Sequence, residues 1–332
     1  MLTHNLAPQP SLWFSPEGPD NGVVVVSEIQ LARNLASLPF CHRMDETQET
    51  ELRKRTESAF QGLDETYSLI DAERLTPTLR DFYQYRGYLT PRWPRSLSVA
   101  HEESRSFVRL GGTDHVVIAA RTGGFDLTGP RTRCEHIDQV LEHELDYAVS
   151  LRLGYLGPDV RRVGTGLTAA VTLHLSALEQ GEALDVLNGA EDGAFGISSA
   201  QGLYRVEYRA QAGETEEETL SKLAGYASRL VHYETEARNE LVARHGDAVS
   251  EAAHRALGTL LHARRLALAE AAELLNLLRF AVAVGLVQEI SLPTVTTMMM
   301  LSHDSQVAVL TEEGDSSLDG RRTQLIRALQ HG

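Results

Sequence analysis

Cysteine is scarce in this sequence, because only Cys41 and Cys134 carry thiols among its 332 residues. Two thiols cannot form the framework of several disulfides that stabilises small secreted domains. The first ten residues, MLTHNLAPQP, lack the basic segment and apolar core of a secretory signal peptide. We therefore expect the chain to work in the reducing environment of the cytoplasm.

Long hydrophobic runs are also missing. No stretch approaches the ~18 consecutive apolar residues that are needed to span a bilayer. The most apolar helical stretch, residues 266–287, is interrupted by Glu270, Glu273, Asn276 and Arg279. We expect this stretch to form a helix that is buried or faces a partner, and we expect no membrane association.

Positively charged residues are too few to balance the negative ones. The chain has 31 lysines and arginines and 46 aspartates and glutamates, which gives a net charge of −15. Such a surface repels nucleic acid and anionic membranes. It tolerates basic partners, including arginine-rich protein segments. Simple solubility explains the same charge, so the charge excludes partners more firmly than it selects one.

Hydrophobic residues make up 42% of the chain, enough for a substantial core. Signals for strands come first and signals for helices come last. Strand patterns occupy residues 23–26, 106–110, 115–120, the start of 166–178, and 202–210; helix patterns occupy 44–62, 134–150 and most of the chain from 216 on. Residues 1–22 look irregular, and a helix start is expected in ARNL at 32–35. This order predicts an α+β domain, residues 1–248, followed by a helical domain, residues 249–332.

Short motifs taken singly identify no chemistry. VGTGLTAAV at residues 163–171 is a weak phosphate-loop candidate and fits a tight turn better. LGGTDHVVI at residues 110–118 fits a hairpin. Cys134, His136, His143 and Glu144 do not have the spacing of a zinc site, so we expect no metal there. No nucleophile elbow is present.

The order of longer blocks is more specific. SLWFSPEGPDNGVVVVSEIQLARNL, TDHVVI, RLGYLGPDVRRVGTGLTAAVTLHLSAL and LYRVEYRAQAGETEEE follow one another between residues 11 and 218. Together they resemble the ATP:guanido phosphotransferase (phosphagen kinase) family, and most closely its bacterial protein-arginine kinases. The resemblance implies a curved antiparallel sheet flanked by helices, followed by a helical dimerisation domain.

The resemblance also implies where a nucleotide would bind. Family members hold the phosphates of ATP with several arginines, because phosphoryl transfer depends on positioning and charge neutralisation. The histidine of the DH element is kept as His115. The arginine positions are occupied instead by Glu28, Gln30, Val117, Thr168 and Asn188.

The substrate side departs from the family in the same way. The carboxylate that orients the guanidinium is replaced by Thr113, and the reactive cysteine by Asp159. Each charge-assisted phosphate contact is worth roughly 1.5–3 kcal/mol. Losing four or five exceeds the ~8 kcal/mol of a micromolar ligand. Arg161 and Arg162, beside the glycine turn, are the candidates for compensation.

A final resemblance lies in SLDGRRTQLIRAL at residues 317–329. It is similar to the phosphoarginine-binding helix of protein-arginine kinases, with Asp319 and Arg322 matching and Leu318 and Thr323 departing. A carboxylate and an arginine can together read a phosphoguanidinium group. An ordinary amphipathic helix is the competing interpretation.

Three functional hypotheses follow. The first is a protein-arginine-kinase-like pseudokinase without a cofactor, whose partner is a second copy, an active paralogue, or arginine-rich protein. The second is an active protein-arginine kinase that uses ATP and Mg at a rebuilt site. The third is a phosphoarginine-binding module. All three require positions 28, 30, 113, 117, 159 and 168 to line one cleft.

Overall fold

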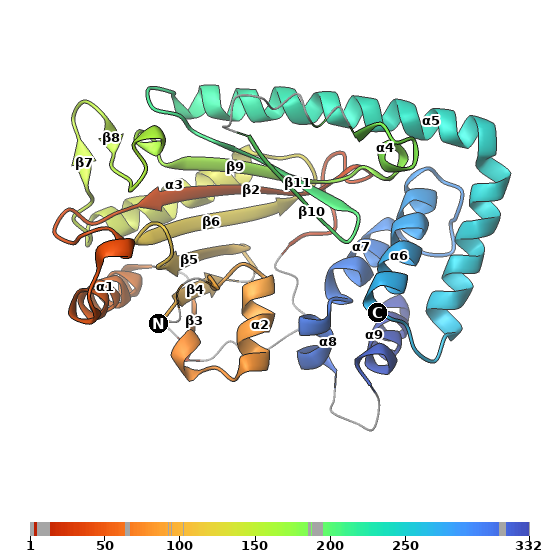
Figure 1. Ribbon diagram of the computed structural model, residues 1–332, viewed down its shortest axis with the longest axis horizontal. Coiled ribbons are helices and arrows are strands. Elements are labelled where there is room, and N and C mark those ends of the chain that lie inside the picture. Colours follow the sequence, from red (N-terminus) through yellow and green to blue (C-terminus); the bar gives the residue numbers. More distant parts are fainter. Residues whose placement is uncertain are drawn as a thin grey trace.

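The computed structural model describes residues 3–4, 14–63, 67–91, 93, 95–101, 103–184, 187, 195–311 and 317–331. Its centre is a nine-stranded sheet in the order β1-β3-β4-β5-β6-β2-β9-β11-β10 (Figure 1). All neighbouring strands are antiparallel except β1 and β3. The strands are β1 Thr3–His4, β2 Val24–Arg33, β3 Ser68–Asp71, β4 Leu97–His101, β5 Ser106–Leu110, β6 Val116–Gly123, β9 Leu167–His174, β10 Phe195–Ala200 and β11 Leu203–Arg209.

A separate hairpin, β7 Val149–Ser150 with β8 Gly154–Tyr155, projects from one end of the sheet (Figure 1). The α-helices are α1 Glu46–Ala59, α2 Pro77–Tyr85, α3 Thr128–Glu142, α4 Ser176–Gln180, α5 Glu216–His262, α6 Leu268–Ala283, α7 Leu292–Leu301, α8 Asp304–Leu310 and α9 Leu318–His331. In Figure 1, α5 runs along the sheet and then bends toward the group formed by α6 to α9. The expected α+β class, an antiparallel sheet followed by helices, is confirmed.

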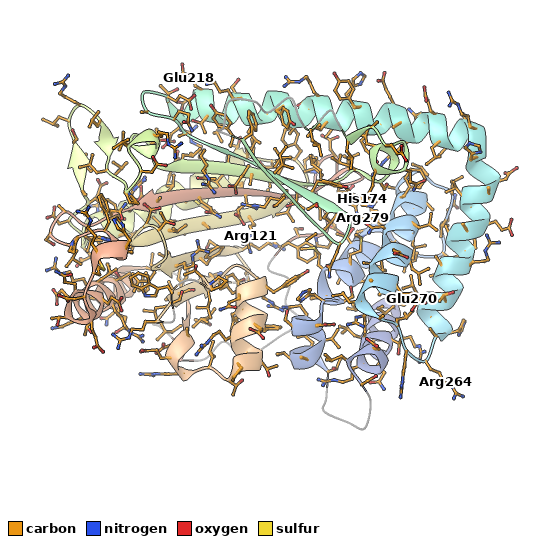
Figure 2. The ribbon with its side chains drawn as sticks, in the orientation of Figure 1. Arg121, His174, Glu218, Arg264, Glu270 and Arg279 are labelled. Atoms are coloured by element: carbon orange, nitrogen blue, oxygen red, sulfur yellow. The ribbon has the colours of Figure 1, made fainter. Side chains whose placement is uncertain are left out.

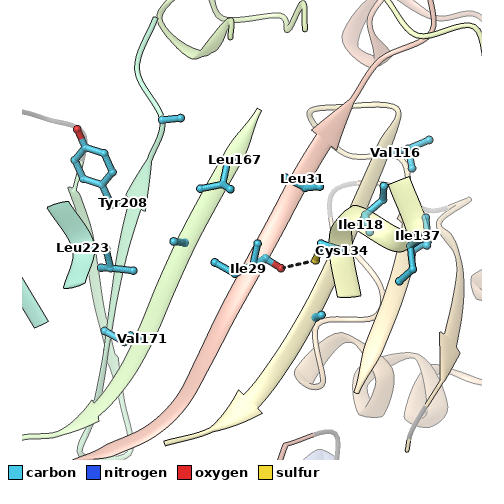
Figure 3. Close-up of a cluster of buried hydrophobic side chains, with 14 of the residues drawn as sticks. Ile29, Leu31, Val116, Ile118, Cys134, Ile137, Leu167, Val171, Tyr208 and Leu223 are labelled. Atoms are coloured by element: carbon cyan, nitrogen blue, oxygen red, sulfur yellow. Dashed lines mark hydrogen bonds between the residues drawn. The ribbon is translucent and has the colours of Figure 1, made fainter. Parts of the chain in front are cut away.

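One face of the sheet is the main core. Alternate residues of the central strands, such as Ile29, Leu31, Ile118 and Val171, point to this face and are fully or almost fully buried. Figure 3 shows them packed with residues of α3 and α5. The Cys134 thiol of α3 donates a hydrogen bond of 3.4 Å to the Ile29 carbonyl. The helices therefore cover this face completely at its centre.

The second face is covered by helix only in part. Phe82 of α2 and Tyr88 pack there against Phe107 of β5 and Ala119 of β6. Behind α2, the buried Arg86 donates to the side-chain oxygen of Gln306 in α8, at 3.0 Å. The C-terminal helices thus contact α2, and they also contact the sheet directly, because the Asn276 amide of α6 donates to the Gln201 carbonyl between β10 and β11 at 3.0 Å.

Several predicted element bounds were wrong. The segment ARNL at residues 32–35 does not start a helix, because β2 continues to Arg33 as part of a fully paired central strand. The helix expected at 134–150 is α3, which ends at Glu142. Leu145 and Ala148 have helical spacing but lie in the connection to β7. The short strands β1, β3, β4, β7, β8 and β10 were not predicted.

The C-terminal helices hide most of their own apolar residues. Leu266, Leu278 and Phe280 are buried, and none of the remaining leucines and valines of α6 is strongly exposed. The expected domain boundary near residue 248 falls inside α5, which has a kink at His245. No helix in the described part of the chain is both long and apolar enough to cross a membrane.

Candidate functional site

The register of the central strands brings four of the predicted positions onto the second face. Gln30 of β2 is paired with Thr168 of β9, and Ala32 with Val117 of β6. Glu28 lies two residues before Gln30 and therefore shares its face. These positions are separated by up to 140 residues in the sequence, so the sheet gathers them as the family resemblance predicts.

Glu28 is the centre of this face. Its carboxylate is 3% exposed and pairs with Arg121 of β6, with Arg205 of β11 at 2.9 Å, and with the Gln30 amide at 2.5 Å. Burial alone would raise the pKa of Glu28. The two guanidinium groups outweigh burial and hold that pKa far below its ordinary value. Glu28 is therefore an ionised carboxylate at neutral pH.

Arg121 and Arg109 lie side by side at the covered end of this face. Arg121 donates to the Arg86 carbonyl at 2.7 Å, and Arg109 donates to the next carbonyl, Gly87, at 3.0 Å. Arg109 pairs with no carboxylate within the described residues, and its buried Nε has no hydrogen-bond partner there. Burial lowers the pKa of Arg109. Figure 2 labels Arg121 between the sheet and α2.

A pocket adjoins this face where β2 and β9 meet the segment 155–159. Asp159, Thr168, Asp114 and Arg209 are among the residues that line it. Thr113 stands next to Asp114 but is exposed on the turn and does not line the pocket. Of the six positions expected in one cleft, four therefore share a sheet face, one lines the pocket beside it, and Thr113 lies outside.

His115 has a structural position. Its ring is fully buried, the Leu35 N–H donates to Nδ1 at 2.9 Å, and Nε2 lies 2.9 Å from the Pro39 carbonyl. Because Nδ1 accepts, Nε2 carries the proton. Burial lowers the pKa of His115, so the ring is neutral. The expectation that His115 faces a nucleotide is wrong for this structure, since both ring nitrogens serve the protein.

Of the two arginines proposed for compensation, only Arg161 has a described side chain, and it pairs with Asp159. Arg161 is exposed and forms a bidentate pair with Asp159, at 2.9 and 3.1 Å. The side chain of Arg162 and the whole of Asn188 lie outside the described residues. Asp159 also caps the turn by accepting from the Arg161 N–H at 3.0 Å.

Asp319 and Arg322 are in contact, but as part of the helical core. Arg322 is fully buried and donates to Asp319 at 2.8 Å, to the Ser302 carbonyl at 2.8 Å, and to Asp304 and the Leu266 carbonyl. A guanidinium held on all sides in this way joins α9 to α8 and to the start of α6. This geometry favours the interpretation as an ordinary packed helix over a phosphoarginine site.

Arg109, Arg121 and Arg205 were not predicted from the sequence as site residues. The signal was present in the alternation of the strands: LYRVEYR places Arg205 and Arg209 opposite Tyr204, Val206 and Tyr208. The sequence does not show how these strands pair, and pairing is what brings the arginines to Glu28, which lies 93 residues from Arg121 and 177 from Arg205.

Comparison with known proteins identifies the family. A family model described as ATP:guanido phosphotransferase, C-terminal catalytic domain, matches residues 46–237. A second, described as Protein-arginine kinase McsB C-terminal domain, matches residues 246–330. The "Protein-arginine kinase" of Halothermothrix orenii is 26% identical over 96% of this chain and 95% of its own length. That of Symbiobacterium thermophilum is 28% identical over 96% of each chain.

Solved structures share the fold. The duplicated taurocyamine kinase of Schistosoma mansoni, solved with transition-state-analogue components, has a TM-score of 0.58 and 18% identity over 70% of this chain. The matched part spans only 36% of that longer protein. A lombricine kinase has a TM-score of 0.55 and 17% identity, covering 69% of this chain and 70% of its own. The chain therefore belongs to the ATP:guanido phosphotransferase family, and its relatives include the protein-arginine kinases.

Proposed function

We propose that this protein is a pseudokinase of the protein-arginine kinase type, which has lost phosphotransfer and acts by binding. The observation that supports the proposal is Glu28, an ionised carboxylate held by Arg121 and Arg205 where the family resemblance calls for a phosphate-binding arginine. Glu28 occupies N–H donors of Arg121 and Arg205 that a phosphate group would otherwise use.

The substrate side supports the same proposal. Thr113 cannot act as the carboxylate that orients a guanidinium, and Asp159 cannot act as a thiol. Asp159 is moreover engaged by Arg161. A working kinase would thus need new groups on both sides of the reaction.

The test is a phosphotransfer assay with ATP and Mg. The protein is incubated with arginine-rich protein, and phosphoarginine is measured with an active protein-arginine kinase as positive control. We expect no product above the enzyme-free blank. Transfer that requires Mg and disappears in Arg109→Gln would instead establish the second hypothesis, an active kinase with a rebuilt site. Arg109 favours this alternative, because a guanidinium group can bind phosphate and this one has no carboxylate partner among the described residues.

For the partner, we propose a second copy of this chain or an active relative. The seven strongly exposed large hydrophobic residues of the described chain do not gather on α6; four of them, Val149, Leu151, Leu153 and Val160, lie on the β7–β8 hairpin and the turn after it. Light scattering tests self-association. A monomer at high concentration, with no complex formed on adding an active relative, would contradict this part of the proposal.

A further inference from the structure

We propose that Arg109, Arg121 and Arg205 form a binding site for a single phosphate group on the second face of the sheet, beside Glu28. The proposal goes beyond the loss of phosphotransfer, because it assigns a ligand to that same face. It depends on the proposed function only in requiring that a Mg–nucleotide does not occupy the face.

The first step is the convergence of the three arginines. Arg109 and Arg121 donate to consecutive carbonyls, those of Gly87 and Arg86, so their guanidinium groups are neighbours. Gly87 has a φ of +76°, and a Cβ there would lie 2.7 Å from Arg121 Nη2. The backbone turn at residues 86–87 is thus fitted closely to these two cations.

Arg205 reaches the same place from the opposite side. Its strand, β11, is separated from β2 by β9, and the β9 residue beside Glu28 is Ala170. The small side chain of Ala170 lets Arg205 extend across β9 to the Glu28 carboxylate. Glu28 therefore binds two arginines from opposite sides of one sheet face.

The second step is the charge. Arg121 and Arg205 pair with Glu28, and Arg109 lies beside Arg121 without a carboxylate of its own among the described residues. Arg209 is paired with Glu207 at 2.5 Å on the same face. Arg205 also has Glu207 nearby, but at 3.6 Å from its Nε. An excess of positive charge that is partly buried is costly unless an anion balances it. In a chain of net charge −15, this concentration is not a general property of the surface.

The third step is the supply of free donors. Within the described residues, Arg109 uses Nη1 for the Gly87 carbonyl, while its Nε is buried without a partner. Arg205 uses Nη2 for Glu28, and its side chain is 30% exposed. The planar guanidinium group of arginine presents paired N–H donors at the spacing of two phosphate oxygens. Partly exposed Arg205 and Gln30 leave a route for a ligand from solvent.

The ligand class follows from the single central carboxylate. One tetrahedral dianion over Glu28 can accept from Arg109 on one side and from Arg205 on the other, and it balances the excess charge. A triphosphate would bring further phosphate groups against that carboxylate, which repels them. A single phosphate group comes from two sources, free orthophosphate or a phosphorylated side chain, and the experiment separates them.

The experiment is a calorimetric titration of the full chain with sodium orthophosphate at low ionic strength. We expect saturable binding with a Kd of about 1 mM or tighter. Arg109→Gln should weaken it at least about tenfold. The matched control is Arg55→Gln, which removes the same charge from an exposed pair with Glu51 on α1 and should leave the Kd unchanged.

Glu28→Gln provides a test in the opposite direction. It frees Arg121 and Arg205 from their counter-ion and should tighten orthophosphate binding at least about tenfold. A purely structural role for Glu28 would lower the melting temperature without tightening. Folding of each variant is checked by circular dichroism, and Arg109→Gln decides the matter if Glu28→Gln does not fold.

Phosphoserine is the second probe. Binding tighter than orthophosphate assigns the site to phosphorylated side chains, and equal or weaker binding assigns it to the free anion. No saturable binding of either probe, or equal weakening by Arg55→Gln, would overturn the site and leave the proposed loss of phosphotransfer intact. Phosphotransfer from ATP would overturn the proposed function, whatever the phosphate titration gives.

Discussion

The two faces of the central sheet are built from the same strands and yet have opposite characters. Ile29 and Leu31 lie on the face covered by α3 and α5, in an apolar core. Glu28 and Gln30, their neighbours in sequence, lie on the second face among arginines. A strand alternates its side chains with a period of two, so one face can change its chemistry while the other keeps its packing.

The comparison explains how a sheet can keep the family fold while the chemistry of one face changes, which is what the proposed function requires. Burial of the apolar face supplies the main driving force for folding. The second face carries Glu28, Gln30, Val117 and Thr168, and the Glu28 carboxylate at its centre is paired with Arg121 and Arg205. The fold therefore depends on one set of alternate residues in these strands, and the chemistry of the site depends on the other set.

The largest expected effect is on the apolar face. Leu31→Ala leaves a cavity in the core and should lower the free energy of unfolding by about 3–5 kcal/mol. Gln30→Ala removes one hydrogen bond to Glu28 and should cost less, about 1.5 kcal/mol. Urea denaturation of both variants measures the difference. Equal losses for the two neighbours would contradict the division between the faces.

The next largest effect is expected from Arg121→Met, which leaves the buried Glu28 with fewer cations. We expect a loss of about 3 kcal/mol at pH 7, since breaking a buried ion pair uncovers a charge. The double variant Arg121→Met with Glu28→Leu should recover much of this loss. If the double variant is as unstable as the sum of the single ones, the pair is not coupled.

A smaller effect is expected at the turn that holds Arg109 and Arg121. Gly87→Ala forces a side chain onto a positive φ and against Arg121, and should cost about 1–3 kcal/mol. Gly213→Ala is the control, because it has a φ of +89° with no atom within 4 Å of the added Cβ. Thermal unfolding of both variants gives the cost of backbone strain from Gly213→Ala, and any additional loss in Gly87→Ala is the cost of the contact with Arg121.

The smallest effect is the dependence of stability on pH. Burial lowers the pKa of His115 below 6.5, so stability should begin to fall as pH drops through 6.5 in the wild type and in Glu28→Gln alike. The pKa of Glu28 is lowered from 4.5, so the stability that its ionised form contributes is lost only below about pH 4.5. Below that pH the wild type should lose stability more steeply than Glu28→Gln; parallel curves throughout would show that the Glu28 ion pairs contribute nothing.

The sequence predicted the fold class and the strands whose alternation is clear. It failed where a local pattern conflicts with pairing: ARNL resembles a helix start, but its strand is held between two neighbours. The site was predicted as a set of substitutions, and the sheet does gather four of them. The replacement network was not predicted, because no local pattern shows that Arg205 crosses Ala170 to reach Glu28.

The burial of His115 and Arg322 also could not be predicted from the sequence. Both residues sit in motifs that the resemblance connects with ligands, and both are fully buried here. Their hydrogen-bond partners come from distant segments, the Pro39 carbonyl for His115 and the Ser302 carbonyl for Arg322. Burial of this kind depends on packing between elements, which motif spacing does not determine.

The central claim is that the second face has been rebuilt around Glu28 so that it no longer holds ATP–Mg. The most direct measurement is a calorimetric titration with ATP–Mg of the wild type and of a reverted chain. The reversion is Glu28→Arg, Gln30→Arg, Val117→Arg and Thr168→Arg, with Arg121→Leu and Arg205→Gln to avoid crowding the new arginine at position 28. We predict no saturable binding by the wild type at millimolar nucleotide and measurable affinity, without turnover, in the reverted chain. Micromolar binding of ATP–Mg by the wild type would contradict the account.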